Sequence, residues 1–319
     1  MAVLFHQNMR VFGGGTAARN AAYHASFAAI AGGLGGAGPV AVAGFTEVMN
    51  NGAADTAFGP GGVGGGLCAA LGVNHIGNIA CGQTALANRP EYVAIGVHAG
   101  LAVVSVGRLI IHATGSSVSL IHNVSPAIPP PAAWCNQLPN AFTPDYRGLV
   151  YVVVNIGGLN IAVGFLHNIF GLGINDHDHR VLVMGQLPYM MTYMGQGIPG
   201  IVAKYIGGDF NCDVVDPRGT PRIGICFAAH AGLPGPPAPV PVIPGAPPPP
   251  PPPFVSDGTT WRGSLYDYWY TNFDPAGPTP GGMLMNPTLP SVNGTTLDTV
   301  LGVNTNDMSD HCATVLQIT

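Results

Sequence analysis

The sequence is short of charge. Only 8% of its 319 residues are Asp, Glu, Lys or Arg, whereas about 25% is usual for a soluble domain. Lysine occurs once, at Lys204, and glutamate only at Glu47 and Glu91. Ten Lys and Arg residues cannot form the broad basic surface on which many nucleic-acid-binding proteins depend. A disordered polyelectrolyte is excluded as well, because the net charge is −5 and 47% of the residues are hydrophobic.

Features of several other protein classes are missing. The six cysteines include no Cys-x-x-Cys pair, which disfavours a structural zinc site. Buried thiols are the simplest interpretation, and Cys68 with Cys81 is the first pair to test for a disulfide. The N-terminus lacks the basic and long apolar regions of a signal peptide, so we expect a cytoplasmic protein or export by a leaderless route. Uncharged runs at 27–46 and 149–175 are long, but Gly, Pro, Asn and His interrupt them, so no membrane span is expected.

The remaining pattern predicts one α/β (α+β) domain over residues 1–319. An Ala-rich segment at 17–31 predicts a helix, and a second is expected around 189–193. Runs rich in β-branched and aromatic residues predict strands at 40–45, 92–98, 102–111, 149–154, 161–166, 201–206, 266–270 and 313–318. These strands are apolar on both faces, which indicates two packed β-sheets with helices outside.

One segment, 233–254, is rich in proline and contains seven consecutive prolines at 247–253. Such a run predicts a polyproline-II surface loop inserted in the domain. It is either a stiff spacer or a docking ligand for the aromatic groove of a protein partner.

Polar side chains gather where the predicted strands end, which is where loops commonly assemble functional sites. Five segments carry them, in the order 7–13 (Gln-Asn-Met-Arg-Val-Phe-Gly), 45–48 (Phe-Thr-Glu-Val), 164–168 (Gly-Phe-Leu-His-Asn), 207–211 (Gly-Gly-Asp-Phe-Asn) and 309–311 (Ser-Asp-His). In this order they resemble the endonuclease/exonuclease/phosphatase superfamily, whose type is deoxyribonuclease I. The resemblance extends from Val3 to Ile318, although Thr46 stands where the family usually has Gln.

The resemblance implies a fold and a metal site. The fold would be the deoxyribonuclease I-like four-layer sandwich, with two packed mixed β-sheets flanked by helices. The ion would be Mg²⁺ or Mn²⁺, with Ca²⁺ as a candidate structural ion. Its implied ligands supply only oxygen atoms, which such hard cations prefer, and are Asn8, Glu47, Asp209, Asn211 and Asp310.

The resemblance also implies the catalytic groups, to which Asp209 and Asn211 belong as well. His167 would pair with Glu91, and His311 with Asp267, each carboxylate orienting its imidazole. We assign His311 to water activation and His167 to protonation of the leaving group, and the reverse assignment stays open.

Two arginines, Arg10 and Arg147, are implied to bind the substrate phosphate. The implied activity is a metal-dependent phosphodiesterase, with DNA as the preferred substrate and endonuclease as the leading hypothesis. The same site could act on a phosphoinositide, a sphingolipid or a small phosphate ester, and the low basicity favours this alternative.

A non-catalytic interaction protein that displays the Pro-rich loop is a third hypothesis. A polar cluster at 175–180 (Asn-Asp-His-Asp-His-Arg) resembles a metal site but matches no family motif.

Overall fold

The computed structural model describes most of the predicted elements. The described residues are 1–35, 38–49, 51–83, 90–114, 117–125, 146–168, 180, 183–184, 187–212, 266–271, 280–285, 309, 311 and 313–318. The Pro-rich segment 233–254, residues 175–179 of the polar cluster and Asp310 lie outside the described residues.

Twelve strands form the framework of the described part of the chain. They are β1 (Ala2–Phe12), β2 (Val40–Val48), β3 (Val73–Gln83), β4 (Pro90–His98), β5 (Ala102–Thr114), β6 (Ser117–Ser125), β7 (Tyr146–Ile156), β8 (Leu159–His167), β9 (Ile201–Asp209), β10 (Asp267–Thr271), β11 (Pro280–Met285) and β12 (Thr314–Ile318). The helices are α1 (Ala17–Gly33), α2 (Asn51–Phe58), α3 (Leu67–Ala70), α5 (Leu187–Tyr193) and the 3-10 turn η2 (Val63–Gly65).

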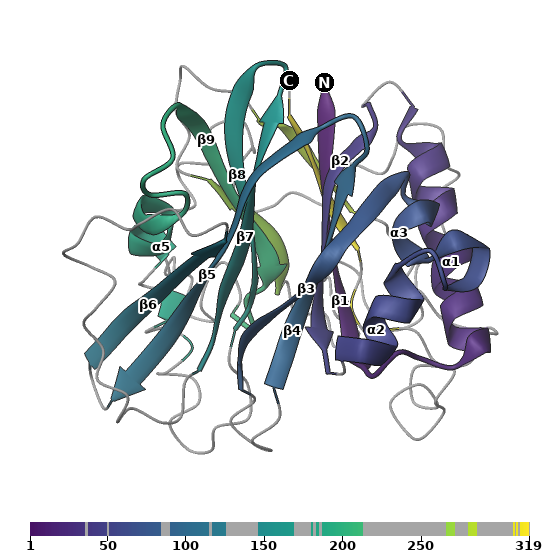
Figure 1. Cartoon of the computed structure of the whole chain (residues 1–319), viewed down its shortest axis with the longest axis horizontal. Coiled ribbons are helices and arrows are strands. Elements are labelled where there is room, and N and C mark those ends of the chain that lie inside the picture. The colour runs from purple at the N-terminus through teal and green to yellow at the C-terminus, as the bar shows by residue number, and fades with distance from the viewer. Residues whose placement is uncertain are drawn as a thin grey trace, which may run out of the picture.

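The strands form two mixed sheets that face each other (Figure 1). The first sheet has the order β3-β4-β2-β1-β12-β11, and the second has the order β6-β5-β7-β8-β9-β10. They meet at one edge through a single residue pair, Gln83 of β3 and Tyr146 of β7. Elsewhere they pack face to face, since β1 and β2 contact β8 and β9. Within the sheets the parallel neighbours are β1 with β2 and β8 with β9, and the pair of β3 and β7 that joins the sheets is parallel as well.

The apolar character of the strands on both faces follows from this packing. In β7 every residue from Leu149 to Val154 is fully buried, because the second sheet meets the first sheet on one face and the α5 region on the other. On that outer side, a side chain at Gly164 would touch Met194, which follows α5. The hydrophobic core between the two sheets is therefore continuous with the core between the second sheet and the α5 region.

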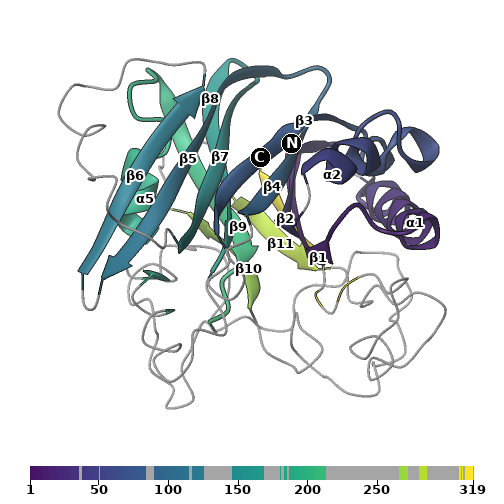
Figure 2. The ribbon, with the colours of Figure 1, turned by 60° about the horizontal axis from the view of Figure 1, so that its bottom comes forward.

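A second core lies between the first sheet and α1, α2 and α3, which cover the outer face of that sheet (Figure 2). Aromatic rings fill it, with centroids 5.3 Å apart for Phe5 and Phe27 and 4.7 Å apart for Phe45 and Phe58. The α1 helix begins at a capping residue, Thr16, whose hydroxyl accepts the Arg19 amide at 3.2 Å. The predicted architecture of two packed mixed sheets flanked by helices is confirmed.

Some elements were not foreseen. The β3 strand contains Asn74, His75 and Asn78, so its sequence shows no strong strand signal, and its place between β4 and β7 comes from pairing. Cys68 and Cys81 are both buried, and they form no disulfide with each other. Among the described residues, no helix is long and apolar enough to cross a membrane.

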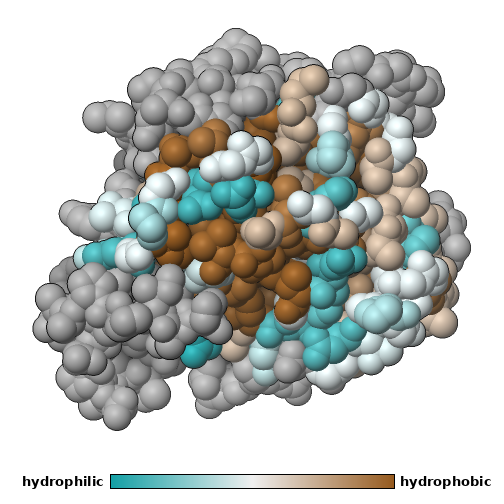
Figure 3. Space-filling model, turned by 45° about the horizontal axis from the view of Figure 1, so that its top comes forward, coloured by the Kyte–Doolittle hydropathy of each residue, from teal (hydrophilic) through white to brown (hydrophobic). Residues whose placement is uncertain are grey.

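The end of the sandwich where β1 begins is partly apolar. Met1, Val103 at the start of β5 and Leu159 at the start of β8 are exposed there. Figure 3 shows an apolar area between hydrophilic patches on this side. The strands β1, β2, β8 and β9 run from this end toward the polar residues described next.

Candidate active site

Three neighbouring strands of the second sheet bring polar residues together where β8 and β9 end. His167, the last residue of β8, lies opposite Asp209, the last residue of β9, in the parallel ladder. Asp267, the first residue of β10, lies opposite Asp209 on its other side. The ladder register therefore aligns His167, Asp209 and Asp267 across the sheet.

The first sheet supplies the facing residues. In the parallel pair of β1 and β2, Asn8 lies opposite Thr46, so Glu47 follows at the same edge. Glu91 is the second residue of β4, and His311 precedes β12. The two sheets thus deliver their polar strand ends to one place.

Two imidazole–carboxylate pairs form across the sandwich. The Nδ1 atom of His167 lies 2.6 Å from Oε1 of Glu91, and Nδ1 of His311 lies 2.7 Å from Oδ2 of Asp267. Both carboxylates are fully buried. Since a carboxylate can only accept, each ring donates from Nδ1, and its Nε2 atom is left facing the site.

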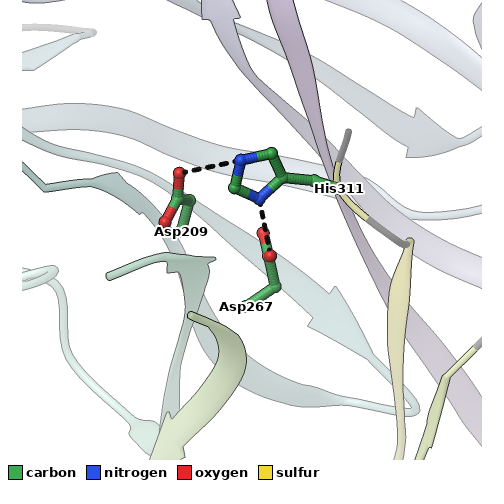
Figure 4. A group of neighbouring side chains, drawn as sticks. All are labelled: Asp209, Asp267 and His311. Atoms are coloured by element: carbon green, nitrogen blue, oxygen red, sulfur yellow. Dashed lines mark hydrogen bonds and ion pairs between the residues drawn. The ribbon is translucent and has the colours of Figure 1, made fainter. Parts of the chain in front are cut away.

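Asp209 lies between the two rings. Its Oδ2 atom is 3.6 Å from Nε2 of His167 and 3.7 Å from Nε2 of His311. Figure 4 shows His311 placed between Asp209 and Asp267. The Asn8 side-chain amide donates to Oδ2 at 2.9 Å, and the Asn211 backbone amide donates to Oδ1 at 2.9 Å.

These contacts set the charge of Asp209. Burial by itself raises the pKa of this carboxyl, but the neighbouring His311 and His167 rings and the amides of Asn211 and Asn8 together hold the pKa below its ordinary value. Asp209 is therefore an anion at neutral pH despite being almost fully buried.

The turn after Asp209 is held by Arg180 and Asn168, which were not among the predicted site residues. Asn211 has a left-handed backbone, with φ of 49°. Arg180 donates to the Asn211 carbonyl at 2.7 Å, and Asn168 donates to the Phe210 carbonyl at 2.8 Å. The position of Asn168, directly after His167 at a strand end, was the available signal.

His6 was also missed. It is fully buried on β1, with Nε2 3.1 Å from the Thr46 hydroxyl and Nδ1 4.0 Å from Oδ1 of Asp267. Burial lowers the pKa of His6 to about 3, so this ring is neutral under ordinary conditions. The departure from the family pattern at Thr46 was the signal, because its hydroxyl is the partner of His6.

The strand β1 bulges where it reaches the site. Its register with β2 passes from Asn8 opposite Thr46 to Phe12 opposite Val48, so residues 9–11 lie against Glu47 alone. Left-handed φ values of 48° occur at Arg10 and Val11, and one of 60° at Glu47. Bulges of this kind redirect side chains beside active sites.

Two predicted site residues are not placed. Arg147 is the second residue of β7, but its side chain is outside the description, as is all of Asp310. The other predicted site residues, which are Asn8, Arg10, Glu47, Glu91, His167, Asp209, Asn211, Asp267 and His311, lie at the same end of the sandwich.

No family model matches the chain, and no curated protein matches it. Solved structures do. Sphingomyelinase C from Streptomyces griseocarneus is 14% identical with a TM-score of 0.53 over 99% of both chains. A mannosyl-6-phosphatase from Bacteroides thetaiotaomicron VPI-5482 is 12% identical with a TM-score of 0.53 over 100% of both chains. A variant of the beta toxin from Staphylococcus aureus, with bound magnesium ions, is 15% identical with a TM-score of 0.52 over 99% of both chains.

The chain has the deoxyribonuclease I-like fold. The similarity to endonuclease/exonuclease/phosphatase proteins inferred from five short segments is thus confirmed at the level of fold. A deoxyribonuclease I-like fold serves many substrates, so activity has to be argued from the residues of the site.

Proposed function

We propose that this protein is a metal-dependent phosphodiesterase that hydrolyses DNA as an endonuclease. The observation that carries the proposal is the pair of carboxylate-anchored imidazoles, His167 with Glu91 and His311 with Asp267, whose Nε2 atoms both face Asp209. Phosphodiester hydrolysis needs one group to take a proton from water and another to protonate the departing oxygen. Two oriented imidazoles around one site provide both.

The carboxylates determine what each ring can do. Because Nδ1 donates to a buried carboxylate, proton transfer takes place at Nε2, and the imidazolium formed is stabilised. We assign water activation to His311 and protonation of the leaving oxygen to His167. His311 is the more exposed ring, with a side chain 12% exposed against 5% for His167, which suits the group that must reach water.

The available oxygen atoms fit a hard cation. Glu47 and Asn8 adjoin at the β1 bulge, and Glu47 is only half-buried. When bound there, Mg²⁺ would neutralise charge on the phosphoryl oxygens. A protein of the same fold, the beta toxin, contains bound magnesium ions. The Asn8 amide joins the pair of Glu47 and Asn8 to Asp209, for which both predicted roles, metal ligand and catalytic group, are kept.

Another arrangement of ligands is possible in principle. Asp209, Asp267 and His311 each offer an atom within 4.8 Å of the others (Figure 4). However, Nδ1 of His311 is already bound to Asp267, and the Nε2 atom is needed for proton transfer in the proposed reaction. We therefore place the cation at Glu47 and Asn8.

A second candidate function keeps this site and changes the substrate to a phosphoinositide, a sphingolipid or a small phosphate ester. The observation in its favour is the small number of cations, since the chain has only ten Lys and Arg residues. Two proteins with the same fold are a sphingomyelinase and a mannosyl-6-phosphatase. A substrate with only one or a few phosphates needs fewer cations for its binding than a nucleic acid does.

The test is nicking of supercoiled plasmid with Mg²⁺, with Mn²⁺ and with EDTA. Wild type should nick in both metals and stop in EDTA, whereas Glu47→Gln and His167→Ala should fail. His98→Ala is the matched control, because His98 closes β4 at the end far from Glu91. Intact plasmid with every metal would rule out the nuclease.

The same preparations are then given sphingomyelin vesicles, a phosphoinositide and a sugar phosphate. Hydrolysis of one of these without plasmid nicking selects the second candidate, provided that Glu47→Gln abolishes it. Hydrolysis that survives Glu47→Gln and EDTA would contradict both candidates.

A further inference from the structure

Arg19 is an interior cation in a chain that has few cations. It lies in the first turn of α1 and is only 9% exposed. An arginine is seldom buried to this degree unless its guanidinium has specific partners. The contacts of Arg19 therefore indicate what it does.

The Arg19 guanidinium is fixed against the β1 bulge. Its Nη2 atom donates to the Met9 carbonyl at 2.7 Å and to the Arg10 carbonyl at 2.8 Å. Its Cζ atom lies 5.5 Å from the Phe12 ring centre and 5.7 Å from that of Tyr23. The Tyr23 hydroxyl also donates to the Met9 carbonyl, at 3.2 Å. Three hydrogen bonds and the contact with Phe12 thus join α1 to the bulge, while Tyr23 packs on the guanidinium from within α1 itself.

The bulge needs such support. Residues 9–11 lie against one residue of β2, so the regular ladder is interrupted there. Buried carbonyls in this position require donors from elsewhere, and Arg19 and Tyr23 provide them. Arg10 and Val11 both have φ of 48°. A left-handed backbone costs a non-glycine residue about 1–3 kcal/mol and persists only where the surroundings enforce it.

The strain of the left-handed backbone is most evident at Val11. Its β-branched side chain is disfavoured at positive φ, and it is 59% exposed, so burial of its side chain does not offset the cost. Strain of this kind concentrates at functional sites. The neighbouring Arg10 amide donates to Oδ1 of Asn8 at 2.8 Å, and the Asn8 amide contacts Asp209. The bulge is therefore continuous with the site.

We propose that Arg19 is a positioning residue that holds the bulge in its left-handed form and so presents Arg10 to the substrate phosphate. This inference rests on the proposed function and on the role of phosphate ligand that the family resemblance implies for Arg10. Arg19 itself does not contact the substrate. Lysine is a poor substitute, since a guanidinium donates while its flat face packs on the Phe12 and Tyr23 rings and an ammonium does not.

The first test is a double-mutant cycle on the hydrolysed substrate. Arg19→Met, which keeps the apolar length of the side chain, should raise KM about 10-fold with a smaller change in kcat, and Arg19→Lys should give part of that effect. In an Arg10→Ala background, Arg19→Met should change KM little, because Arg19 affects KM through Arg10 and the Arg10 side chain is already removed. Additive effects of the two substitutions would overturn the proposal.

Rescue by glycine separates positioning from general stability. Glycine adopts positive φ freely, so Val11→Gly should restore a substantial part of KM in the Arg19→Met protein. Lys204→Met is the matched control, because Lys204 is likewise a cation that donates to two backbone carbonyls, those of Met191 at 2.6 Å and Thr192 at 3.2 Å, and it lies far along β9 from Asp209. The proposal fails if Lys204→Met raises KM as much, or if Val11→Gly gives no rescue.

A readout without turnover distinguishes this proposal from the proposed function. Amide hydrogen exchange at residues 10–12 should quicken at least 10-fold in Arg19→Met and stay unchanged in Lys204→Met. Binding of inorganic phosphate by calorimetry should weaken in Arg19→Met and in Arg10→Ala to a similar degree. If no substrate is hydrolysed, the phosphodiesterase proposal falls, and exchange and phosphate binding still decide the role of Arg19. Unchanged exchange in Arg19→Met would overturn it.

Discussion

The two histidine–carboxylate pairs are similar in geometry but cross the sandwich in opposite directions. His167 lies on the second sheet and pairs with Glu91 of the first sheet. His311 precedes a strand of the first sheet and pairs with Asp267 of the second sheet. The Nδ1–oxygen distances, 2.6 and 2.7 Å, are nearly the same. Because each pair joins both sheets, neither can form before the sheets pack.

The pairs differ in what lies around them. His311 is the more exposed ring. Behind its partner Asp267 lies the neutral ring of His6, with Nδ1 at 4.0 Å from Oδ1. Behind Glu91 lies the Cys81 thiol, which donates to the Glu91 carbonyl at 3.3 Å. Equal geometry with unequal surroundings suggests that the two rings have different tasks, and the four predictions below test this in order of decreasing effect.

The largest expected effect comes from deleting each ring. His167→Ala and His311→Ala should each lower kcat by about 10²- to 10⁴-fold on an ordinary phosphodiester, the usual range for general acid–base groups. On a nitrophenyl phosphodiester, whose leaving group needs no proton, His167→Ala should recover most of its activity and His311→Ala should not. The measurement is steady-state kcat on both substrates. Recovery by His311→Ala instead would exchange the assigned roles.

The next prediction concerns the carboxylates. Glu91→Gln and Asp267→Asn should each lower kcat/KM by about 10²-fold or more, because an amide no longer stabilises the imidazolium or fixes the tautomer. Loss of the negative charge makes each ring release its proton at lower pH. The alkaline limb of the pH–kcat/KM profile should therefore move to lower pH in Glu91→Gln, and the acidic limb should do so in Asp267→Asn. Both variants moving the same limb would contradict separate tasks.

His6 allows a test of stability against pH. Its pKa is lowered from 6.5 to about 3 on folding, so between these values the unfolded chain binds a proton that the folded protein does not. Stability from this source is full above pH 6.5 and falls as the pH decreases toward 3. Lowering the pH from 7 to about 4.5 should therefore remove roughly 2–3 kcal/mol of the free energy of unfolding.

Urea denaturation across that range should therefore show a smaller acid-induced loss of stability in His6→Gln than in wild type, with His98→Gln as the control for removal of a histidine. If the His6→Gln and wild-type curves run parallel, the ring is not buried as a neutral group. The same variant should affect kcat less than Asp267→Asn, because His6 lies beside the pair and is not part of it.

The smallest expected effect is at Cys81. Cys81→Ala removes one weak thiol hydrogen bond and a small buried volume, which should cost about 1 kcal/mol of stability. The activity should stay within about twofold of wild type, since only the Glu91 backbone is contacted. Thermal unfolding and kcat give the comparison, with Cys68→Ala as a second buried thiol outside the site. A large loss of kcat would mean that Glu91 depends on this thiol for its position.

Much of this arrangement could be predicted from the sequence. The rarity of acids made both glutamates conspicuous, and strand-end segments such as Gly207–Asn211 identified the fold. The strands β4, β5, β7, β8, β9 and β12 begin or end close to their predicted bounds, because β-branched runs buried on both faces leave a clear signal. The strand β3 was missed, since a strand with polar residues owes its place to neighbours on either side.

In the site, the sequence supplied residue types and their order, but not the contacts that support them. His6 and Arg19 have no distinctive local pattern, and Arg180 belongs to a polar cluster that resembles a metal site and gives no sign of its contact with Asn211. Their roles depend on partners that lie far from them in the sequence or, for Arg19, on a backbone bulge that no local rule predicts. A bulge arises from the mismatch between two paired strands, and a single strand does not reveal it.

The sequence by itself determined which groups were available: few charges, two glutamates, polar residues at strand ends and a set of apolar strands that must be buried on both faces. Only the tertiary structure decided that Asp209 lies between the two rings, that His6 lies behind Asp267, and that an interior arginine holds the bulge. The physical reason is that burial pattern and turn chemistry are local properties of a chain. The distance between His167 and Glu91 is instead set by how two sheets pack, and many residues contribute to that packing at once.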